Sequence, residues 1–366
     1  MPHCHVGLYQ NNPSPDANQV KLFYTTSGGG PVKVLFIIGF AGTHKCWDRQ
    51  VSYLAGTPND SIQVCTFDNR GMGQSTIPTK KSEYTTRKMA KDAIALMDHL
   101  GWQKAHVFGH SMGAMVACKL AALVPERVLS LALLNVTGGG YQCIPKIDSG
   151  SLSLALRFLR AKTPEQRAAV DLDTHYSQEY LAERIGDRPR RSILYDEYVN
   201  NIRATGMQSK HGCEGQMHAC WNHVVTRTEI ESIRVAAFPV SVIHGRHDII
   251  AQMRHAKRLA EKLYPSARMV ELNGGHQLMH ERTDEVNKAL LELIKASKTM
   301  TSLYEWTNLP NRSNGESTSS SFIISNLDKL RVFLVYFFSL FAMAFGQIQR
   351  GVKRRLKPIR VGPALT

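Results

Sequence analysis

A repeated alternation of short apolar runs with amphipathic stretches constrains the fold of this chain more than any other feature. Residues 105–109 (AHVFG) and 128–136 (VLSLALLNV) are almost continuously apolar, as strands covered on both faces of a parallel sheet usually are. The stretch 85–100 before them predicts an amphipathic helix, because its apolar residues recur on one face and Gly101 ends it. This alternation predicts an α/β fold with a mostly parallel, doubly wound sheet.

One long insertion interrupts the alternation. Before it, residues 20–26 and 32–39 predict a first pair of strands around the turn SGGG, and 63–70 predict a third strand. Residues 138–236 are mostly helical, as a cap over an active site would be, and the strand rhythm then returns. The chain is therefore predicted to hold a first half of the core at 1–137, a helical cap at 138–236 inserted after the sixth strand, and a second half of the core at 237–299.

The composition changes again after residue 299. Residues 300–330 are predicted to form a flexible linker, because their middle part is rich in Asn, Ser, Thr and Gly. In the last part, 331–366, an apolar run at 332–346 precedes six basic residues with no acid among them: Arg350, Lys353, Arg354, Arg355, Lys357 and Arg360. We predict a membrane-attachment segment with a basic tail for anionic headgroups. A buried packing helix is the alternative, and the run is too short to decide between spanning and dipping into the bilayer.

The overall charge and the cysteines limit the partners and the compartment. The formal net charge is +15, but the basic residues concentrate in the tail, and no basic face with interleaved aromatics indicates nucleic-acid binding. Seven irregularly spaced cysteines and a start without an apolar signal core favour reduced thiols. We therefore expect a membrane-associated protein whose catalytic domain faces the cytosol, with the endoplasmic reticulum as one candidate. The oligomeric state stays open.

The strongest chemical signal is the sequence Gly109-His110-Ser111-Met112-Gly113. It follows the apolar strand 105–109 and opens a helix of small residues. A serine at such a sharp strand-to-helix turn exposes its hydroxyl, and the helix N-terminus offers free N–H groups to a developing oxyanion. Ser111 is therefore the predicted nucleophile, the alternative being a glycine-rich turn with an idle serine.

Together with this motif, several others resemble those of the α/β-hydrolase fold superfamily, and of its plant members in particular. They are GFAGT at 39–43, DNRGMGQS at 68–75, HGRHD at 244–248 and GGH at 274–276. The resemblance covers about residues 20–297. It implies an α/β-hydrolase fold, no cofactor, and a serine rather than the aspartate that haloalkane dehalogenases and epoxide hydrolases carry in the same turn.

The family order of serine, acid and histidine implies Asp248 as the acid and His276 as the base. The rival bases are His110, His244, His247 and His280. The resemblance also implies an oxyanion hole made by the main-chain N–H groups of Phe40 and Met112. Ile38 stands where the family usually has histidine before Gly39, so the support of this loop is expected to differ.

The cap contains a cluster that invites a metal: His211, Cys213, His218, Cys220 and His223. Its spacing matches no zinc pattern, so we predict no metal site there. Met207, Met217 and Trp221 are predicted instead to form an apolar wall of the substrate cavity, with cap packing as the alternative.

The sequence thus predicts a serine hydrolase that cleaves a carboxylic ester of a lipophilic small molecule or lipid through an acyl-enzyme on Ser111. Two alternatives of the same fold stay open. One is a slowly hydrolysing ligand receptor, and the other is a lyase that uses the same triad.

Overall fold

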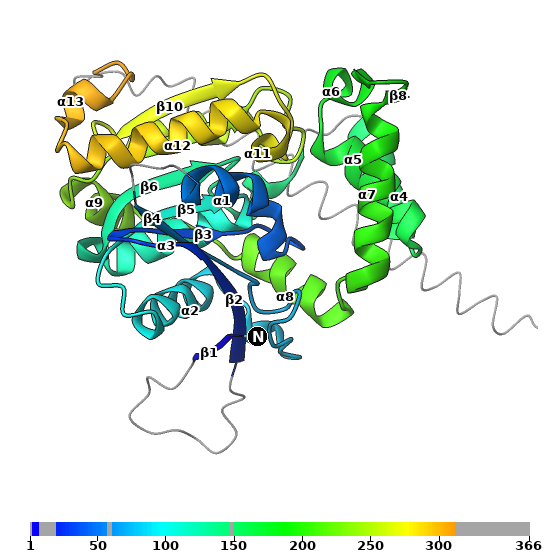
Figure 1. Cartoon of the computed structure of the whole chain (residues 1–366), viewed down its shortest axis with the longest axis horizontal. Helices are drawn as coiled ribbons and strands as arrows, with labels where there is room; N and C mark the ends of the chain where they lie inside the picture. Colours follow the sequence, from blue (N-terminus) through cyan, green and yellow to red (C-terminus); the bar gives the residue numbers. More distant parts are fainter. Residues whose placement is uncertain (1, 7–19, 57–60, 146–148, 312–366) are drawn as a thin grey trace, which may run out of the picture. The chain divides into compact units, whose positions relative to one another are not determined.

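The computed structural model describes residues 2–6, 20–56, 61–145 and 149–311, all within one compact unit, 1–311. Its centre is an eight-stranded sheet in the order β1-β2-β4-β3-β5-β6-β9-β10 (Figure 1). β1 pairs with β2, and β2 with β4, in antiparallel orientation. From β4 to β10 in this order, all neighbouring strands run parallel. The strands are β1 (His3–Val6), β2 (Val20–Gly28), β3 (Val32–Ile37), β4 (Ile62–Phe67), β5 (Ala105–His110), β6 (Val128–Leu134), β9 (Val240–Gly245) and β10 (Ala267–Leu272).

The predicted first pair of strands is wrong in its pairing. β2 and β3 both form, but β4 lies between them and pairs with each. The physical reason is burial, because β3 ends in the residues Val34 to Ile37, all fully buried, and such a strand needs a neighbour and a helical layer on both sides. The glycine-rich turn therefore connects two strands that are not neighbours in the sheet, and β2 and β3 do not form a hairpin.

Helices cover both faces of the sheet, and successive residues of the strands point to opposite faces. On β3, Leu35 and Ile37 join the larger core cluster under one set of helices, whereas Val34 and Phe36 join the cluster on the other face. The first set is α2 (Thr86–His99), α3 (Met112–Leu123), α9 (Arg227–Val235) and α10 (Met253–Lys262), and the second is α1 (Asp48–Ala55) and α12 (Thr283–Lys298). The result is the predicted three-layer α/β architecture (Figure 1).

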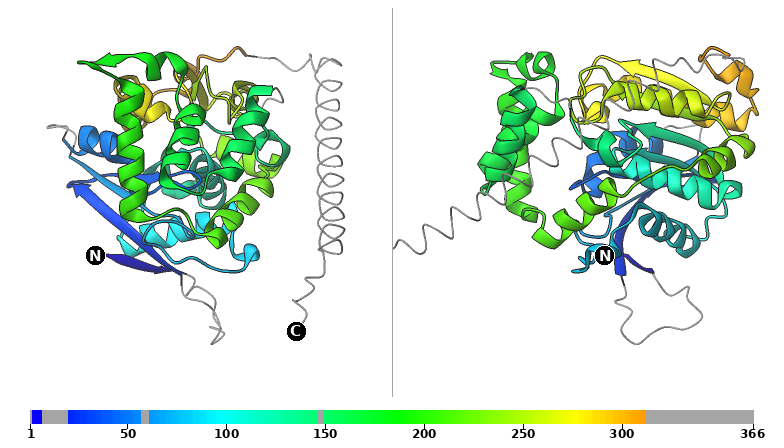
Figure 2. Two further views of the ribbon diagram at one scale, coloured as in Figure 1. Left: turned by 90° about the vertical axis from the view of Figure 1, so that its right-hand side faces the viewer. Right: turned by 180° about the vertical axis from the view of Figure 1, so that it is seen from behind.

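The cap follows β6, the sixth strand, and its helices stand beside the sheet (Figure 2). It has a small core of its own around Leu172, Tyr180 and Leu194. Its elements are α4 (Ser149–Arg160), α5 (Pro164–His175), α6 (Gln178–Ala182), the two-stranded β7 (Arg184–Ile185) and β8 (Arg188–Pro189), α7 (Arg190–Thr205) and α8 (Lys210–Trp221). α9 falls inside the predicted cap range but packs on α3, with Ile230 and Ile233 in the main core. The cap therefore ends before α9.

Part of the range predicted as a flexible linker, 300–330, is folded. A short helix, α13 (Leu303–Trp306), folds back on the sheet. The Trp306 ring is buried, its Nε1–H donates to the carbonyl oxygen of Val240 at 2.9 Å, and the Arg268 guanidinium lies over it. Hydrogen bonds of Thr307 and Asn308 to the main chain of β10 also hold the segment. Residues 312–330 and the predicted membrane segment 331–366 lie outside the described residues.

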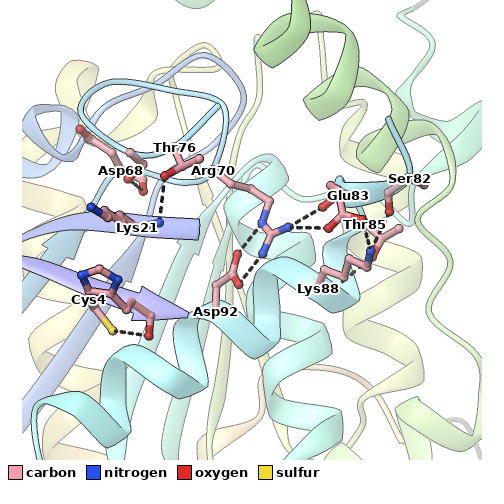
Figure 3. A network of polar contacts seen from close by, with 12 residues as sticks. Cys4, Lys21, Asp68, Arg70, Thr76, Ser82, Glu83, Thr85, Lys88 and Asp92 are labelled. Carbon is pink, nitrogen blue, oxygen red and sulfur yellow. Dashed lines mark hydrogen bonds and ion pairs between the residues drawn. The ribbon is translucent and has the colours of Figure 1, made fainter. Parts of the chain in front are cut away.

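A buried ion pair fastens the loop after β4 to helix α2 (Figure 3). Arg70 donates from Nε and Nη2 to the two carboxylate oxygens of Asp92, both at 2.6 Å, and from Nη1 to the carbonyl oxygen of Glu83 at 2.7 Å. Both partners are about 5% exposed. This bidentate geometry satisfies both buried charges and gives Arg70 a structural position.

Replacing Arg70 by methionine should lower the free energy of unfolding by about 3–5 kcal/mol, because it leaves the Asp92 carboxylate buried without its cation. Urea denaturation measures the change. Arg188→Met is the matched control, since Arg188 pairs with Asp196 where both side chains are 55% exposed, and it should cost less than about 1 kcal/mol. Equal losses in the two variants would contradict the role given to the buried pair.

Candidate active site

Ser111 lies between the end of β5 and the first residue of α3, in a backbone conformation that an L-residue rarely adopts. Its φ is 54° and its ψ is −120°, and such strain persists only where the surroundings enforce it. The enforcement is close packing, because a Cβ on Gly113 would lie 2.0 Å from the Ile37 carbonyl oxygen and one on Gly109 would lie 2.4 Å from that of Gly113. Only glycine fits at these two positions, which explains the spacing of the motif.

Three loops at the carboxyl edge of the sheet bring together the predicted nucleophile, base and acid. His276 Nε2 lies 3.0 Å from Ser111 Oγ, and His276 Nδ1 lies 2.8 Å from Asp248 Oδ2. In the tautomer with the proton on Nδ1, His276 donates to the carboxylate and accepts from the serine hydroxyl. Asp248 follows β9 by three residues, on a loop, and His276 follows β10. In this arrangement the histidine can act as the base that activates the serine hydroxyl, and the aspartate orients the histidine.

Asp248 is buried and held by four donors. The main-chain N–H groups of Ile250 and Ala251 both donate to Oδ1 at 2.8 Å, and Asn135 Nδ2 donates to Oδ2 at 2.6 Å. Burial opposes the charge, but the charge and hydrogen bond of His276, together with His244 and the Asn135 amide, outweigh it and lower the pKa of Asp248 to about 2. The carboxylate is therefore ionised at neutral pH and can stabilise an imidazolium.

Asn135 is a site residue that the sequence did not reveal. It follows β6 directly and adopts a positive φ of 49°. Its amide also lies 3.3 Å from the carbonyl oxygen of Gly275, so it joins the acid loop to the histidine loop. A polar residue just after a buried parallel strand, at the edge where ligands bind, was the signal that could have indicated it.

The loop that carries His276 is anchored from both the core and the cap. His110 Nε2 donates to the His276 carbonyl oxygen at 2.8 Å, and Gln277 N–H donates to the carbonyl oxygen of His175 in the cap at 2.8 Å. The Glu281 carboxylate accepts from Gly275 N–H at 2.8 Å and from the hydroxyl of Ser177. These contacts fix the imidazole through its main chain.

The rival histidines are engaged elsewhere. His110 lies beneath Ser111, His244 Nε2 pairs with the Ala251 carbonyl oxygen, and His247 Nε2 lies 2.6 Å from Asn273 Oδ1. His280 Nε2 pairs with the Cys46 carbonyl oxygen. Of these five histidines, the geometry directs His276 alone at Ser111 Oγ.

The predicted oxyanion donors lie on either side of the serine. The loop from Gly39 presses against it, since a Cβ on Gly39 would lie 2.9 Å from Ser111 Cβ. Within the part of the chain that the structure describes, neither Phe40 N–H nor Met112 N–H has a hydrogen-bond acceptor. Asn69 Nδ2 donates to the Ile38 carbonyl oxygen at 2.7 Å, which supports the loop through main chain where the family histidine is missing.

A cavity of about 540 Å³ opens over Ser111. Its lining is mainly apolar and includes two of the three predicted wall residues, Met217 and Trp221, together with Phe40, Met115 and Ile250. Met207 is not among the lining residues and is 41% exposed, because it precedes α8 rather than lying on its inner face. Polar residues of the lining include Lys81, Glu214, His218 and Asn222.

Two of the five metal candidates of the cap have other partners. His218 Nδ1 lies 3.1 Å from the Tyr84 carbonyl oxygen, and His223 Nδ1 lies 2.9 Å from Thr86 Oγ1. In the described ranges, no three His, Cys, Asp or Glu side chains form a group that could hold a metal ion.

Comparison with known proteins places this arrangement in a family. The family model for the alpha/beta hydrolase fold matches residues 33–283. The chain belongs to the α/β-hydrolase family. A protein of Mycobacterium tuberculosis provisionally named non-heme bromoperoxidase BpoC is 28% identical over 294 residues, which cover 76% of this chain and 99% of that protein.

Other relatives match over shorter stretches. The dihydrolipoyllysine-residue acetyltransferase component of the acetoin cleaving system of Cupriavidus necator is 39% identical over 125 residues, which cover 34% of this chain and 32% of that relative's length. Epoxide hydrolase 2 of Siraitia grosvenorii is 32% identical over 119 residues, which cover 32% of this chain and 36% of that protein. These comparisons do not support a particular nearness to plant members.

The solved structures establish the fold alone. The enol-lactonase from Burkholderia xenovorans LB400 superposes with a TM-score of 0.61 at 24% identity, covering 75% of this chain and 97% of that one. A thermophilic esterase from Thermogutta terrifontis gives the same TM-score at 19% identity, with 81% and 99% covered. The α/β-hydrolase fold predicted from the sequence is confirmed.

Asn135→Gly should lower the rate at which a fluorophosphonate labels Ser111 by about 10- to 100-fold, because it removes a donor to a buried carboxylate. Glycine keeps the positive φ, so the backbone is not strained by the change. Labelling kinetics measure the effect. Asn308→Gly is the control, since the Asn308 side chain forms hydrogen bonds with the main chain of Met269 on the edge strand β10; it should label like the wild type. An unchanged labelling rate for Asn135→Gly would argue against the role of Asn135 in holding Asp248.

Proposed function

We propose that the chain is a serine hydrolase that cleaves a carboxylic ester of a lipophilic small molecule or lipid through an acyl-enzyme on Ser111. The observation that carries this proposal is the continuous hydrogen-bonded series from Ser111 Oγ through His276 to Asp248. The relatives named above as hydrolases belong to the same family but leave the ester itself open, so the bond cleaved is inferred from the site.

The chemistry follows from the geometry. Ser111 Oγ attacks the ester carbonyl carbon while its proton passes to His276 Nε2, and the resulting imidazolium faces the Asp248 carboxylate. The N–H groups of Phe40 and Met112 donate hydrogen bonds to the tetrahedral oxyanion. His276 then protonates the leaving alcohol, and a water that it deprotonates releases the acid from the serine.

The cavity supports a lipophilic substrate. Its walls near Ser111 are formed by methionine, tryptophan, phenylalanine and isoleucine side chains, and its volume of about 540 Å³ falls in the range of small-molecule sites. Apolar surface of a substrate would be removed from water there. Ser111 also occupies the position where, in the family pattern, epoxide hydrolases carry aspartate, which favours acyl transfer.

A panel of short-chain, long-chain and aryl esters tests the proposal with the full-length chain. Ser111→Ala should lower kcat on the preferred ester by at least about 10³-fold without lowering Tm. His276→Gln should lose activity comparably, whereas His247→Gln, at an exposed rival base, should keep it. If the wild type is no faster than Ser111→Ala on every ester, the receptor or lyase alternatives replace the hydrolase.

We also propose that residues 331–366 attach the protein to a membrane, with the catalytic domain facing the cytosol. Among the described helices, none has the length and hydropathy to cross a bilayer. The proposal rests on the apolar run 332–346 and on the basic residues after it.

Carbonate washing of membranes that carry the full-length chain tests this attachment. The chain should stay in the pellet until detergent is added, because apolar side chains inserted in the bilayer hold it there, whereas alkaline carbonate releases proteins that adhere to the surface alone. A chain that ends at residue 311 should be released to the supernatant. Release of the full-length chain by carbonate alone would refute the proposal.

A further inference from the structure

The side chain of Gln216, on helix α8 of the cap, is fully buried against the core. Its Oε1 accepts from the main-chain N–H of Ala41 at 3.0 Å, and its Nε2 donates to the carbonyl oxygen of Arg70 at 3.0 Å. Gln208 Nε2 donates to the same Oε1 at 2.9 Å. One cap side chain therefore bridges two core loops, and one of them is the loop that carries the Phe40 N–H.

Two glycines let α8 come close enough for this bridge. A Cβ on Gly212 would lie 2.1 Å from the carbonyl oxygen of Gly71, and one on Gly215 would lie 2.3 Å from the Tyr84 ring. Glycine weakens a helix, so two of them on one face, three residues apart, indicate that contact with the core outweighs helix propensity here. The position of Gln216 is thus fixed by the backbone of α8.

The bridge meets the oxyanion loop at its strained residue. Gly42 N–H donates to the Gly39 carbonyl oxygen at 3.3 Å, which closes a turn over residues 39–42, and Ala41 has a φ of 56°. A positive φ at the third residue of a turn is the type II geometry, which normally requires glycine. Ala41 alone would favour a negative φ, and the peptide between Phe40 and Ala41 would then turn over.

We propose that Gln216 is a positioning residue: by accepting from the Ala41 N–H it fixes the turn over residues 39–42, and this turn presents the Phe40 N–H to the oxyanion. The inference rests on the proposed hydrolase function. Because α8 also supplies Met217 and Trp221 to the cavity wall, the same helix contacts the substrate and orders the oxyanion donor.

Gln216→Met tests the inference, because it keeps the length of the side chain and removes its hydrogen bonds to both core loops and to Gln208. With 4-nitrophenyl butyrate, kcat should fall by about 10- to 100-fold, while KM stays within about twofold. The Ki of a trifluoromethyl ketone, which forms a tetrahedral adduct with serine, should rise by the same factor as kcat falls. Gln166→Met, at an exposed cap glutamine that accepts from Lys162 N–H, is the matched control and should behave as wild type.

A second substitution separates positioning from general destabilisation. Ala41→Gly removes the strain of the positive φ, so Ala41→Gly combined with Gln216→Met should recover most of the lost kcat. A merely structural role of Gln216 predicts no such rescue. Should Gln216→Met not fold, as judged by its melting temperature, Gln216→Asn takes its place, since it is too short to reach both loops.

The outcomes distinguish this inference from the proposed function. If the wild type neither hydrolyses the ester nor labels at Ser111 with a fluorophosphonate, the hydrolase itself is refuted. If the wild type is active and Gln216→Met matches it in kcat and in Ki, or loses KM alone, the positioning role is refuted and the hydrolase stands.

Discussion

The close approach of three backbones around Ser111 is the constraint on which the site depends. Gly113 lies against the Ile37 carbonyl and Gly39 lies against Ser111 itself, so the end of β3, the end of β5 and the start of α3 are locked in one arrangement. That packing enforces the positive φ of Ser111 and leaves the N–H of Met112 free of the helix. The strain at one residue is thus offset by burial in the sheet around it.

The cap contributes to the same site through polar contacts as well as through the apolar cavity wall of Met217 and Trp221. The carbonyl of His175 and the hydroxyl of Ser177 hold the loop of His276, and the amide of Gln216 holds the loop of Phe40. The cap has its own small core, but its helix α8 packs on the main core. A buried polar group that loses its hydrogen bond costs free energy. The positions of the two loops therefore depend on the position of the cap.

The sequence was enough to predict the fold, the insertion after β6 and the residues that the structure brings together at Ser111. Those residues follow strands of a parallel sheet, and the carboxyl ends of such strands meet at one edge. The pairing of β2 with β3 was predicted wrongly, because neighbouring runs around a glycine turn look the same whether or not a third strand separates them. Asn135 and Gln216 were missed because their partners lie more than one hundred residues away in the chain, and no local period records such a contact.

The electrostatics around His276 follow from the same burial. The rings of His110 and His175 lie 4.9 Å and 6.2 Å from its ring, between centroids. Burial, with the nearby imidazole of His276 as a smaller cause, lowers the pKa of His110 to about 3 and that of His175 well below its usual value. Both neighbours are therefore neutral at physiological pH, and no second cation opposes the one that forms on His276. The ionised Asp248 then faces the positive charge that forms on His276 when it takes the proton of Ser111. Of these three histidines, His276 is the one that takes up the serine proton, because burial keeps His110 and His175 neutral.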